Sequence, residues 1–383
     1  MKNNKYILYT ISFLHGLVFY GAFSVIFRES RGLDLSNILL LESIFVILMI
    51  IFEVPWGIIG DKIGYKNTLV ISFGLFLLSK IVFYYSYSFL GFLMESVIAA
   101  MAISGISGCD SALLYSSIDK SESDKAFGIY GAMGTAGFLV SSLISGILVR
   151  YSMDLLAFAT IISYAVAFLL SLNLQDIKKD KEVKHYEKNE SILKSLKMVI
   201  KNKRIIVFVL AVSVLSETTH SICVFLNQNL YIKSGVDLKW FGVLTALMQV
   251  ATFIALRAYK IKKKVGENKL LNGALILVIL CNFFLIRSSV ALFTIALIFV
   301  IEGAFALTQP ITETIKNESV TSTNRATILS AYAMVSNIVA SVINIIISEA
   351  SKVSLEGALL CCLILNIVAM IPMGIYLRSK IER

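Results

Sequence analysis

The chain has 383 residues, of which 57% are hydrophobic and only 16% are charged. Its mean hydropathy of +0.81 lies far outside the range of soluble domains, so the composition excludes an ordinary soluble protein and predicts a membrane protein. The formal net charge is +10, and its meaning depends on which side of the membrane the basic residues face.

Twelve apolar segments, separated by charged or Gly/Asn-containing breaks, are each long enough to cross a bilayer, which takes about 20 residues. The first follows only "MKNNK" and has no A-x-A cleavage pattern, so we expect a retained helix rather than a removed signal peptide. The predicted fold is an all-α membrane protein with twelve transmembrane helices, at residues 6–27, 36–60, 68–87, 90–116, 126–149, 153–173, 205–231, 238–257, 268–287, 289–315, 326–348 and 355–377.

The distribution of lysine and arginine predicts the orientation of these helices. With both termini in the cytoplasm, most of the 35 basic residues lie inside, a few such as Arg28 and Arg31 lie outside, and Lys80 lies within the third span. The positive charge then faces the anionic cytoplasmic leaflet, so we expect membrane lipids, and not nucleic acid, as partners. The usage of Lys, Asn and Ile is typical of an AT-rich bacterial genome, which predicts a multi-pass protein of the bacterial cytoplasmic (inner) membrane.

A basic break at residues 174–204 divides the spans six and six, which predicts an N-terminal bundle at 1–173 and a C-terminal bundle at 205–383. Within the break, "SILKSLKMVIKNK" has its apolar residues on one helical face, so it fits either a helix on the cytoplasmic leaflet or a solvated linker helix. "GLDLSNILLLESI" from Gly32 aligns without gaps on "GVDLKWFGVLTAL" from Gly235. Two matching halves are typical of transporters.

The stretch "EVPWGIIGDKIGYKN", residues 53–67, ends the second predicted span. Glu53, Gly57 and Asp61 are spaced four residues apart and therefore lie on one face of this helix. The glycine permits close approach of another helix to that face. Pro55 is expected to bend this helix before a short charged turn. The residues that we assign to a cytoplasmic gate in this stretch are Glu53, Gly57, Asp61, Lys62, Gly64 and Lys66.

This stretch resembles the loop signature between helices 2 and 3 of the major facilitator superfamily, and with the twelve spans and the repeat the resemblance covers the whole chain. It implies that Asp61 sits at the positive N-terminal end of helix 11, which begins near Arg325, and latches the two halves on the cytoplasmic side. It also implies that spans 1, 4, 7 and 10 line a central substrate cavity. The chain is similar to drug:proton antiporters of the family, although Met101 stands where these often carry an arginine and span 5 lacks their proline.

Ionisable side chains inside the membrane are costly, so each is a candidate functional residue. Glu217 and Glu302 lie near the predicted midplane, and His220 follows Glu217 by one helical turn. Once burial raises the pKa of a carboxylate, or a neighbouring acid raises that of a histidine, these three residues and His15 would exchange protons at physiological pH, which favours a role in proton coupling. For His15 the alternative is a structural histidine that is hydrogen-bonded to a neighbouring helix.

Other polar and aromatic residues of the spans suggest structural, gating or substrate-binding roles. Glu95 in span 4 lies at the depth of Lys80 and is expected to pair with it, in a structural or a transport role. Asp110 and Glu313, near the predicted cytoplasmic ends of spans 4 and 10, are expected at a gate. The glycines of span 5 are expected to let it slide against a helix of the other half. Further contacts to substrate are expected from Gln228, Gln309, Phe19 and Tyr20.

We therefore predict a secondary active transporter that works by alternating access and exports amphipathic or cationic, drug-like compounds in exchange for protons. Protonation of Glu217 or Glu302 would compete with binding of a positively charged substrate. No G-x-x-x-x-G-K-[ST] occurs, so we expect the proton gradient to supply the energy, and no cofactor. The alternative is a narrow-specificity exporter or importer of a peptide, sugar or other metabolite.

A polytopic membrane enzyme is a lower-ranked alternative. The chain has no G-x-S-x-G, no H-E-x-x-H and only three histidines, so we expect no enzymatic activity. Its five cysteines all lie in apolar runs, and we expect no disulfide and no metal site. We expect a monomer. A sensor or scaffold that transports nothing is the remaining alternative.

Overall fold

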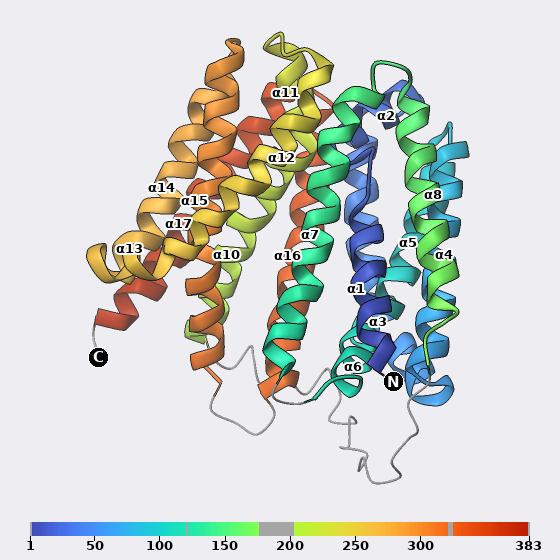
Figure 1. Cartoon of the computed structure of the whole chain (residues 1–383). Helices are drawn as coiled ribbons and strands as arrows, with labels where there is room; N and C mark the ends of the chain where they lie inside the picture. The colour runs from blue at the N-terminus through green and yellow to red at the C-terminus, as the bar shows by residue number, and fades with distance from the viewer. Residues whose placement is uncertain (1, 120–121, 176–202, 321–324, 382–383) are drawn as a thin grey trace. The chain divides into compact units, whose positions relative to one another are not determined.

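The structure is a computed structural model, and it describes residues 2–119, 122–175, 203–320 and 325–381. All regular structure in these ranges is helical, and twelve stretches within them are long and apolar enough to span a membrane. Their bounds agree with the predicted spans to within about three residues, except that the eighth continues to Val265. The basic segment that follows the eighth predicted span forms helix α13 (Ala258–Val265). The predicted all-α fold with twelve transmembrane helices is confirmed (Figure 1).

The helices group into two compact units. Unit 1 contains residues 1–183 and 237–246, and unit 2 contains residues 184–236 and 247–383. Most of the expected linker 174–204, including its amphipathic segment, lies outside the described residues.

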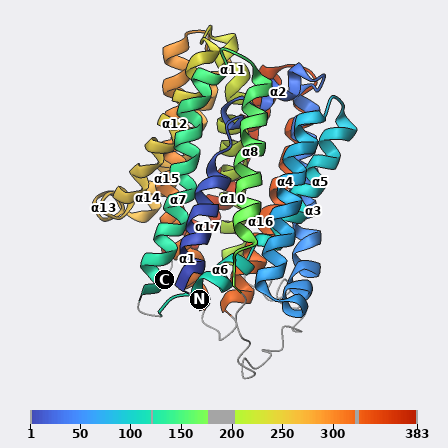
Figure 2. The ribbon, with the colours of Figure 1, turned by 45° about the vertical axis from the view of Figure 1, so that its right-hand side comes forward.

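Unit 1 is built around helix α1, which packs against α7 and α8, while α4 packs against α5 and α8. α1 and α7 lie side by side in both views (Figures 1 and 2). Buried side chains of α1, α4 and α6 form one of its apolar clusters, among them Leu8, Ile11, Leu69, Phe73 and Leu113. The elements of this unit are α1 (Lys2–Gly16), η1 (Gly21–Phe23), α2 (Ser24–Ser30), α3 (Leu35–Ile63), α4 (Tyr65–Tyr85), α5 (Phe89–Ile106), α6 (Cys109–Ser116), α7 (Ser123–Leu148), α8 (Met153–Ser171) and η4 (Leu238–Trp240).

Glycines of α7 bring this helix close to α1. A Cβ atom on Gly137 would overlap the main-chain carbonyl of Phe13, and one on Gly16 would overlap the carbonyl of Gly134. Small residues permit such backbone contact between membrane helices. The expectation that the glycines of span 5 face the other half is therefore wrong for Gly134 and Gly137, which belong to a contact inside unit 1.

Unit 2 has α10 packed against α16 and α17, and α14 packed against α15 and α17. Helix α15 contains Pro310 without interruption, and α17 contains Pro372. α12 (Phe241–Ala251) begins in unit 1 and ends in unit 2. The remaining elements of unit 2 are α10 (Lys203–His220), the π-helix η3 (Ser221–Leu226), α11 (Asn227–Lys233), η5 (Thr252–Arg257), α13, α14 (Glu267–Ile286), α15 (Ala291–Glu318), α16 (Arg325–Ser351) and α17 (Leu355–Ile381).

The two aligned segments of the internal repeat have the same local geometry. Gly32 and Gly235 both have positive φ angles, 90° and 79°, which glycine adopts at little cost. Two residues later, the side chains of Asp34 and Asp237 each accept a hydrogen bond from a main-chain N–H of the helical turn that follows. The shared sequence G-x-D-L thus encodes one turn in both places, which supports the duplication.

Candidate functional site

The first span is not a continuous helix. α1 ends at Gly16 and helical structure resumes only at η1 (Figure 2). Side chains of α8 bond the backbone in between: the Phe19 N–H donates to Thr160 Oγ1 at 3.0 Å, and the Ser163 hydroxyl donates to the Leu17 carbonyl at 3.2 Å. Unpaired backbone groups cost several kcal/mol in lipid, so such a break persists only where protein groups satisfy it. Broken helices of this kind form substrate sites in transporters.

The break brings two residues singled out from the sequence, His15 and Tyr20, among aromatic side chains. The His15 ring centroid lies 4.9 Å from those of both Phe73 and Tyr164, and its buried Nε2 atom has no hydrogen-bond partner among the residues that the structure describes. Tyr20 is buried and stacks on Phe83, with the ring centroids 4.2 Å apart. These residues sit in a largely apolar environment that contains one unsatisfied ring nitrogen.

Next to this aromatic region lies a buried cluster of three charged side chains, which we call the cationic cluster: Arg28, Lys80 and Glu95. Lys80 Nζ lies 3.8 Å from Glu95 Oε1, which confirms the expected pair, and Arg28 Nη2 lies 3.6 Å from Glu95 Oε2. Glu95 and Lys80 are only 5% and 8% exposed at their side chains. Arg28 belongs to α2, and its side chain lies beside Glu95 inside unit 1, while its place on the outer side of the membrane stays a prediction.

In unit 2, Glu217 is held by side chains from its own helix and from α16. The Asn344 amide donates to Glu217 Oε1 at 2.7 Å, and His220 Nδ1 lies 3.4 Å from the same oxygen. Glu217 is buried, with 11% of its side chain exposed, whereas 42% of the His220 side chain is exposed. The expected proximity of Glu217 and His220 is confirmed, and Asn344 is a partner that the sequence analysis missed.

The helix that carries Glu217 changes its winding directly after this group. Residues 221–226 form a π-helix, in which hydrogen bonds run from residue i to i+5 and one residue is in effect inserted. Ser221 Oγ donates to Asn344 Oδ1 at 3.3 Å, so the same asparagine bonds the acid and the first residue of the π-helix. Thr218 Oγ1 donates to Asn366 Oδ1 of α17 at 3.0 Å. Isolated π-turns frequently mark functional sites.

A cavity of about 150 Å³ lies between α10, α15 and α16, within unit 2. Its wall includes Glu217 and Gln309, both singled out from the sequence. Apart from Val212 and Ala340 its lining is polar: Ser213, Ser216, Glu217, Gln309, Thr312, Lys316, Ser336 and Asn337. On the same measure one water needs about 10–15 Å³, so the cavity has room for several waters or one small polar group.

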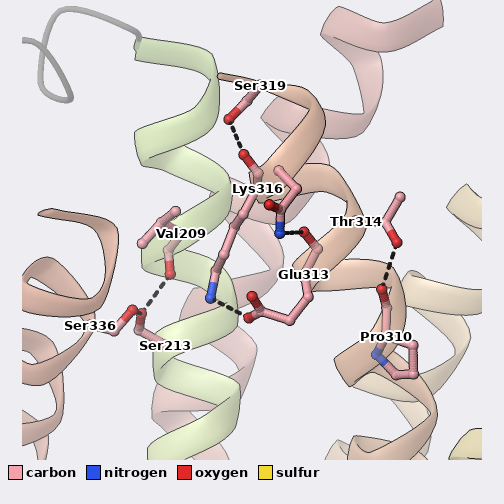
Figure 3. Close-up of polar contacts among 9 residues, drawn as sticks. Val209, Ser213, Pro310, Glu313, Thr314, Lys316, Ser319 and Ser336 are labelled. Atoms are coloured by element: carbon pink, nitrogen blue, oxygen red, sulfur yellow. Dashed lines mark hydrogen bonds and ion pairs between the residues drawn. The ribbon is translucent and has the colours of Figure 1, made fainter. Parts of the chain in front are cut away.

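The polar bonds at one end of this cavity appear in Figure 3. Lys316 Nζ lies 3.0 Å from Glu313 Oε1 on the same helix, and the Ser213 hydroxyl contacts that of Ser336 at 2.8 Å. Glu313 is exposed. The Ser213–Ser336 contact connects α10 with α16. The ion pair with Glu313 fixes the position of the Lys316 ammonium group, which belongs to a residue of the cavity wall.

Two further predicted residues of unit 2 do not line the cavity. Glu302 lies on α15, half-buried and two turns before Gln309, and its side chain bonds that of Cys223 in the π-helix and lies close enough to His220 to interact with it. Gln228 is buried on α11, where its amide donates to the Val224 carbonyl at 3.4 Å. The structure thus brings Glu217, His220 and Gln309 together, places Glu302 beside the π-helix and His220, and leaves Gln228 apart.

The charged turn after α3 is formed at Gly64, a glycine with a positive φ angle. Gly64 separates α3 from α4 with a φ of 87°, and Gly266 separates α13 from α14 with a φ of 86°. Glu53 and Lys62 are exposed, and Gly57 and Lys66 are partly buried. The side chains of Asp61 and Arg325 are outside the described part, so the latch implied by the resemblance stays a prediction.

Asp110 lies in the first turn of α6, after Gly108 interrupts span 4 with a φ of 80°. The Tyr130 hydroxyl of α7 donates to Asp110 Oδ2 at 2.9 Å, and the Ser111 N–H donates to Oδ1 at 2.6 Å. Both oxygens of this acid are therefore engaged inside unit 1.

Comparison with known proteins places these features in a family. The model of the Major Facilitator Superfamily matches residues 6–343. The uncharacterized MFS-type transporter YxaM of Bacillus subtilis (strain 168) is 24% identical over 213 residues, or 54% of this chain and 53% of that protein. The chain thus matches about half the length of this curated relative.

Solved structures share the fold over nearly the whole chain. The nucleoside transporter NupG superposes with a TM-score of 0.78 at 15% identity, covering 98% of this chain and 98% of that chain. A peptide transporter, POT, in complex with sulfate gives a TM-score of 0.75 at 13% identity, covering 99% and 94%. A bacterial homolog of the human lysosomal transporter Spinster gives 0.74 at 12% identity, covering 100% and 97%.

The family and these similar structures are transporters rather than enzymes, which confirms that part of the prediction. With twelve membrane-spanning helices and a family match over most of its length, the chain is a multi-pass membrane protein that belongs to the Major Facilitator Superfamily of transporters.

Proposed function

We propose that the protein is a proton-coupled secondary transporter of a small polar metabolite and that Glu217 carries the coupling proton. The observation that carries this proposal is a buried acid, bonded by Asn344, on the wall of a polar cavity. We further propose that it works by alternating access as a monomer in the bacterial cytoplasmic membrane, with both termini in the cytoplasm.

Glu217 is a buried acid within a membrane span. A charged group within the membrane costs about 2.5–3.5 kcal/mol on insertion scales, so an acid at this position indicates a function. One neutral amide and one partly exposed imidazole oppose that cost at Glu217, and His220 offers a route between its carboxylate and solvent. Gain or loss of a proton changes the hydrogen bonds that Asn344 makes to Glu217 and Ser221, so it acts on the π-helix directly.

The chemistry and the size of the cavity support a small polar substrate. Hydroxyl and amide groups dominate its wall, and its 150 Å³ is below the roughly 300–1,000 Å³ of pockets for drug-sized ligands. The similar solved structures include nucleoside and peptide transporters, which is consistent with a polar metabolite.

Export of amphipathic cations is the second candidate. It is favoured by two acids of unit 2, Glu217 and Glu302, which lie within spans and would attract a cation in exchange for a proton. In both cases the proposed gate contains Glu53, Gly57, Asp61, Lys62, Gly64, Lys66, Asp110 and Glu313.

The test is solute-induced proton movement in proteoliposomes that contain a pH-sensitive dye. Nucleosides, dipeptides, sugars, amino acids and lipophilic cations are added in turn to wild type, Glu217→Gln and Glu349→Gln. Glu349 is the matched control, because it is an exposed acid of unit 2 paired with Lys352. We expect one solute class to move protons in wild type and in the Glu349 variant, and none in the Glu217 variant. Equal proton movement with Glu217→Gln, or none with any solute, contradicts the proposal.

A further inference from the structure

The charges of the cationic cluster do not balance. Arg28 and Lys80 share a single carboxylate, that of Glu95, and each of its oxygens faces a different cation. The three groups together carry one excess positive charge. Burying an ion costs several kcal/mol unless its partners compensate, and one acid cannot fully compensate two bases.

The bonds inside the cluster are also long and incomplete. The ion-pair distances of 3.6 and 3.8 Å exceed those of charge-assisted hydrogen bonds, which are about 2.7–2.9 Å. Arg28 Nε and His15 Nε2 are both buried, and neither has a hydrogen-bond partner in the described part of the chain. His15 borders the cluster because its ring and the Lys80 ammonium group contact the same two side chains, Phe76 and Tyr164.

An arginine three residues away shows what a completed site looks like. Arg31 Nη2 lies 2.6 Å from Asp154 Oδ1, and its Nη1 donates to the Tyr84 carbonyl at 3.2 Å. Arg31 pairs one cation with one acid at short distance, whereas Arg28 has a long contact to a shared acid. Arg31, the C-terminal cap of α2, is therefore a structural arginine, whereas Arg28, within α2, has donors left to bind a ligand.

We propose that Arg28 and Lys80 bind the carboxylate of a monoanionic substrate. One excess positive charge matches one negative charge, and a carboxylate offers the two oxygens that a guanidinium group bonds side by side. The rings of Tyr20, Phe76 and Tyr164, whose centroids lie 4.8–5.8 Å from Lys80 Nζ, border the cluster, so the apolar part of such a substrate would lie beside aromatic side chains. This inference rests on the proposed transport of a small polar solute and adds its charge.

Glu95 competes with the substrate in this arrangement, which fixes the sign of a mutational test. Removing its charge leaves two cations without an acid, so a carboxylate binds more tightly. Removing either cation weakens binding. A purely structural ion cluster predicts no such opposite effects on a ligand.

The experiment measures thermal unfolding of the full-length protein in detergent against increasing sodium lactate, benzoate or gluconate. Sodium chloride and sodium sulfate at equal ionic strength and the neutral amides of the acids are the controls. We expect a saturable rise in Tm with at least one monocarboxylate in wild type and in Arg31→Gln. The half-saturating concentration should be at least tenfold higher in Arg28→Gln and Lys80→Gln and lower than wild type in Glu95→Gln.

The inference would be overturned if no monocarboxylate raises the Tm of the wild type more than chloride does, or if sulfate is the one anion that raises it. It would also be overturned if Arg28→Gln responds to monocarboxylates like the wild type. If the Arg28 and Lys80 variants fail to fold, the Glu95→Gln variant decides the question. Unchanged or weaker binding of monocarboxylates by this variant would contradict the competition between Glu95 and the substrate. No proton gradient is present, so this result is separate from that of the Glu217 test.

Discussion

The first and seventh spans occupy corresponding places in the two halves of the repeat, and both depart from regular α-helix, but in different ways. Span 1 loses its helix after Gly16, and hydroxyl groups of α8 satisfy the freed backbone. Span 7 stays helical but changes from α-helix to π-helix shortly after Glu217. The backbone groups freed in span 1 are hydrogen-bonded by side chains of another helix, whereas a π-helix keeps its hydrogen bonds within its own backbone. Removing a side-chain partner should therefore destabilise span 1 more than span 7.

The largest expected effect is at the contact that holds α1 in position. Gly137→Leu should prevent folding, or cost more than about 3 kcal/mol of stability, because the new side chain overlaps the main-chain carbonyl of Phe13. Gly128→Leu is the control, since a Cβ atom there meets nothing within 4 Å. Size-exclusion profiles and Tm in detergent measure both. Equal behaviour of the two variants would show that α1 does not depend on α7.

A smaller effect is expected from isosteric Thr→Val substitutions, one at the break in span 1 and one in span 7, which test the difference between the two spans. Thr160→Val leaves the Phe19 N–H without its acceptor and should cost about 1–3 kcal/mol. Thr219→Val should cost nothing or stabilise, because Thr219 Oγ1 is buried and has no partner among the described residues. Chemical or thermal unfolding of both variants tests the difference. A larger loss at Thr219 would contradict the distinction drawn between the spans.

The smallest effect is expected at the turn that the two halves share. Hydrogen bonds from Lys239 hold the pKa of exposed Asp237 below its usual range. A lowered pKa in the folded state means that the contribution of Asp237 is present at neutral pH and is lost as the pH falls through that pKa. Asp237→Asn should therefore lower Tm slightly at pH 7, and the difference should shrink under acid. A difference that grows on acidification would show that another group is responsible.

Hydropathy predicted the twelve spans because membrane helices need long apolar runs, and depth within those runs predicted the Lys80–Glu95 pair. It did not predict the break in span 1, because "HGLVFYGAF" stays apolar while its hydrogen bonds change partners. Gly16 and Gly21, which flank the break, were the available signal. Nor did hydropathy predict that Arg28, at the end of span 1, contacts Glu95 inside unit 1, since a charge at a span end normally marks the boundary.

The neighbours of Glu217 were only partly predictable. His220 follows by one helical turn, so spacing along one helix was sufficient. Asn344 lies 127 residues away, and nothing in "SVINIIIS" indicates which residue its amide bonds. The π-helix involves no change in composition. Contacts between helices far apart in the sequence therefore determine the partner of the acid and the winding beside it.

The most direct test of the account compares two modes of transport in proteoliposomes, with the solute that moves protons in wild type. Counterflow exchange needs no net proton movement, whereas accumulation driven by a pH gradient does. If Glu217 carries the proton, Glu217→Gln retains counterflow exchange of the labelled solute and loses gradient-driven accumulation. Gradient-driven accumulation by this variant at the wild-type rate would contradict the central claim.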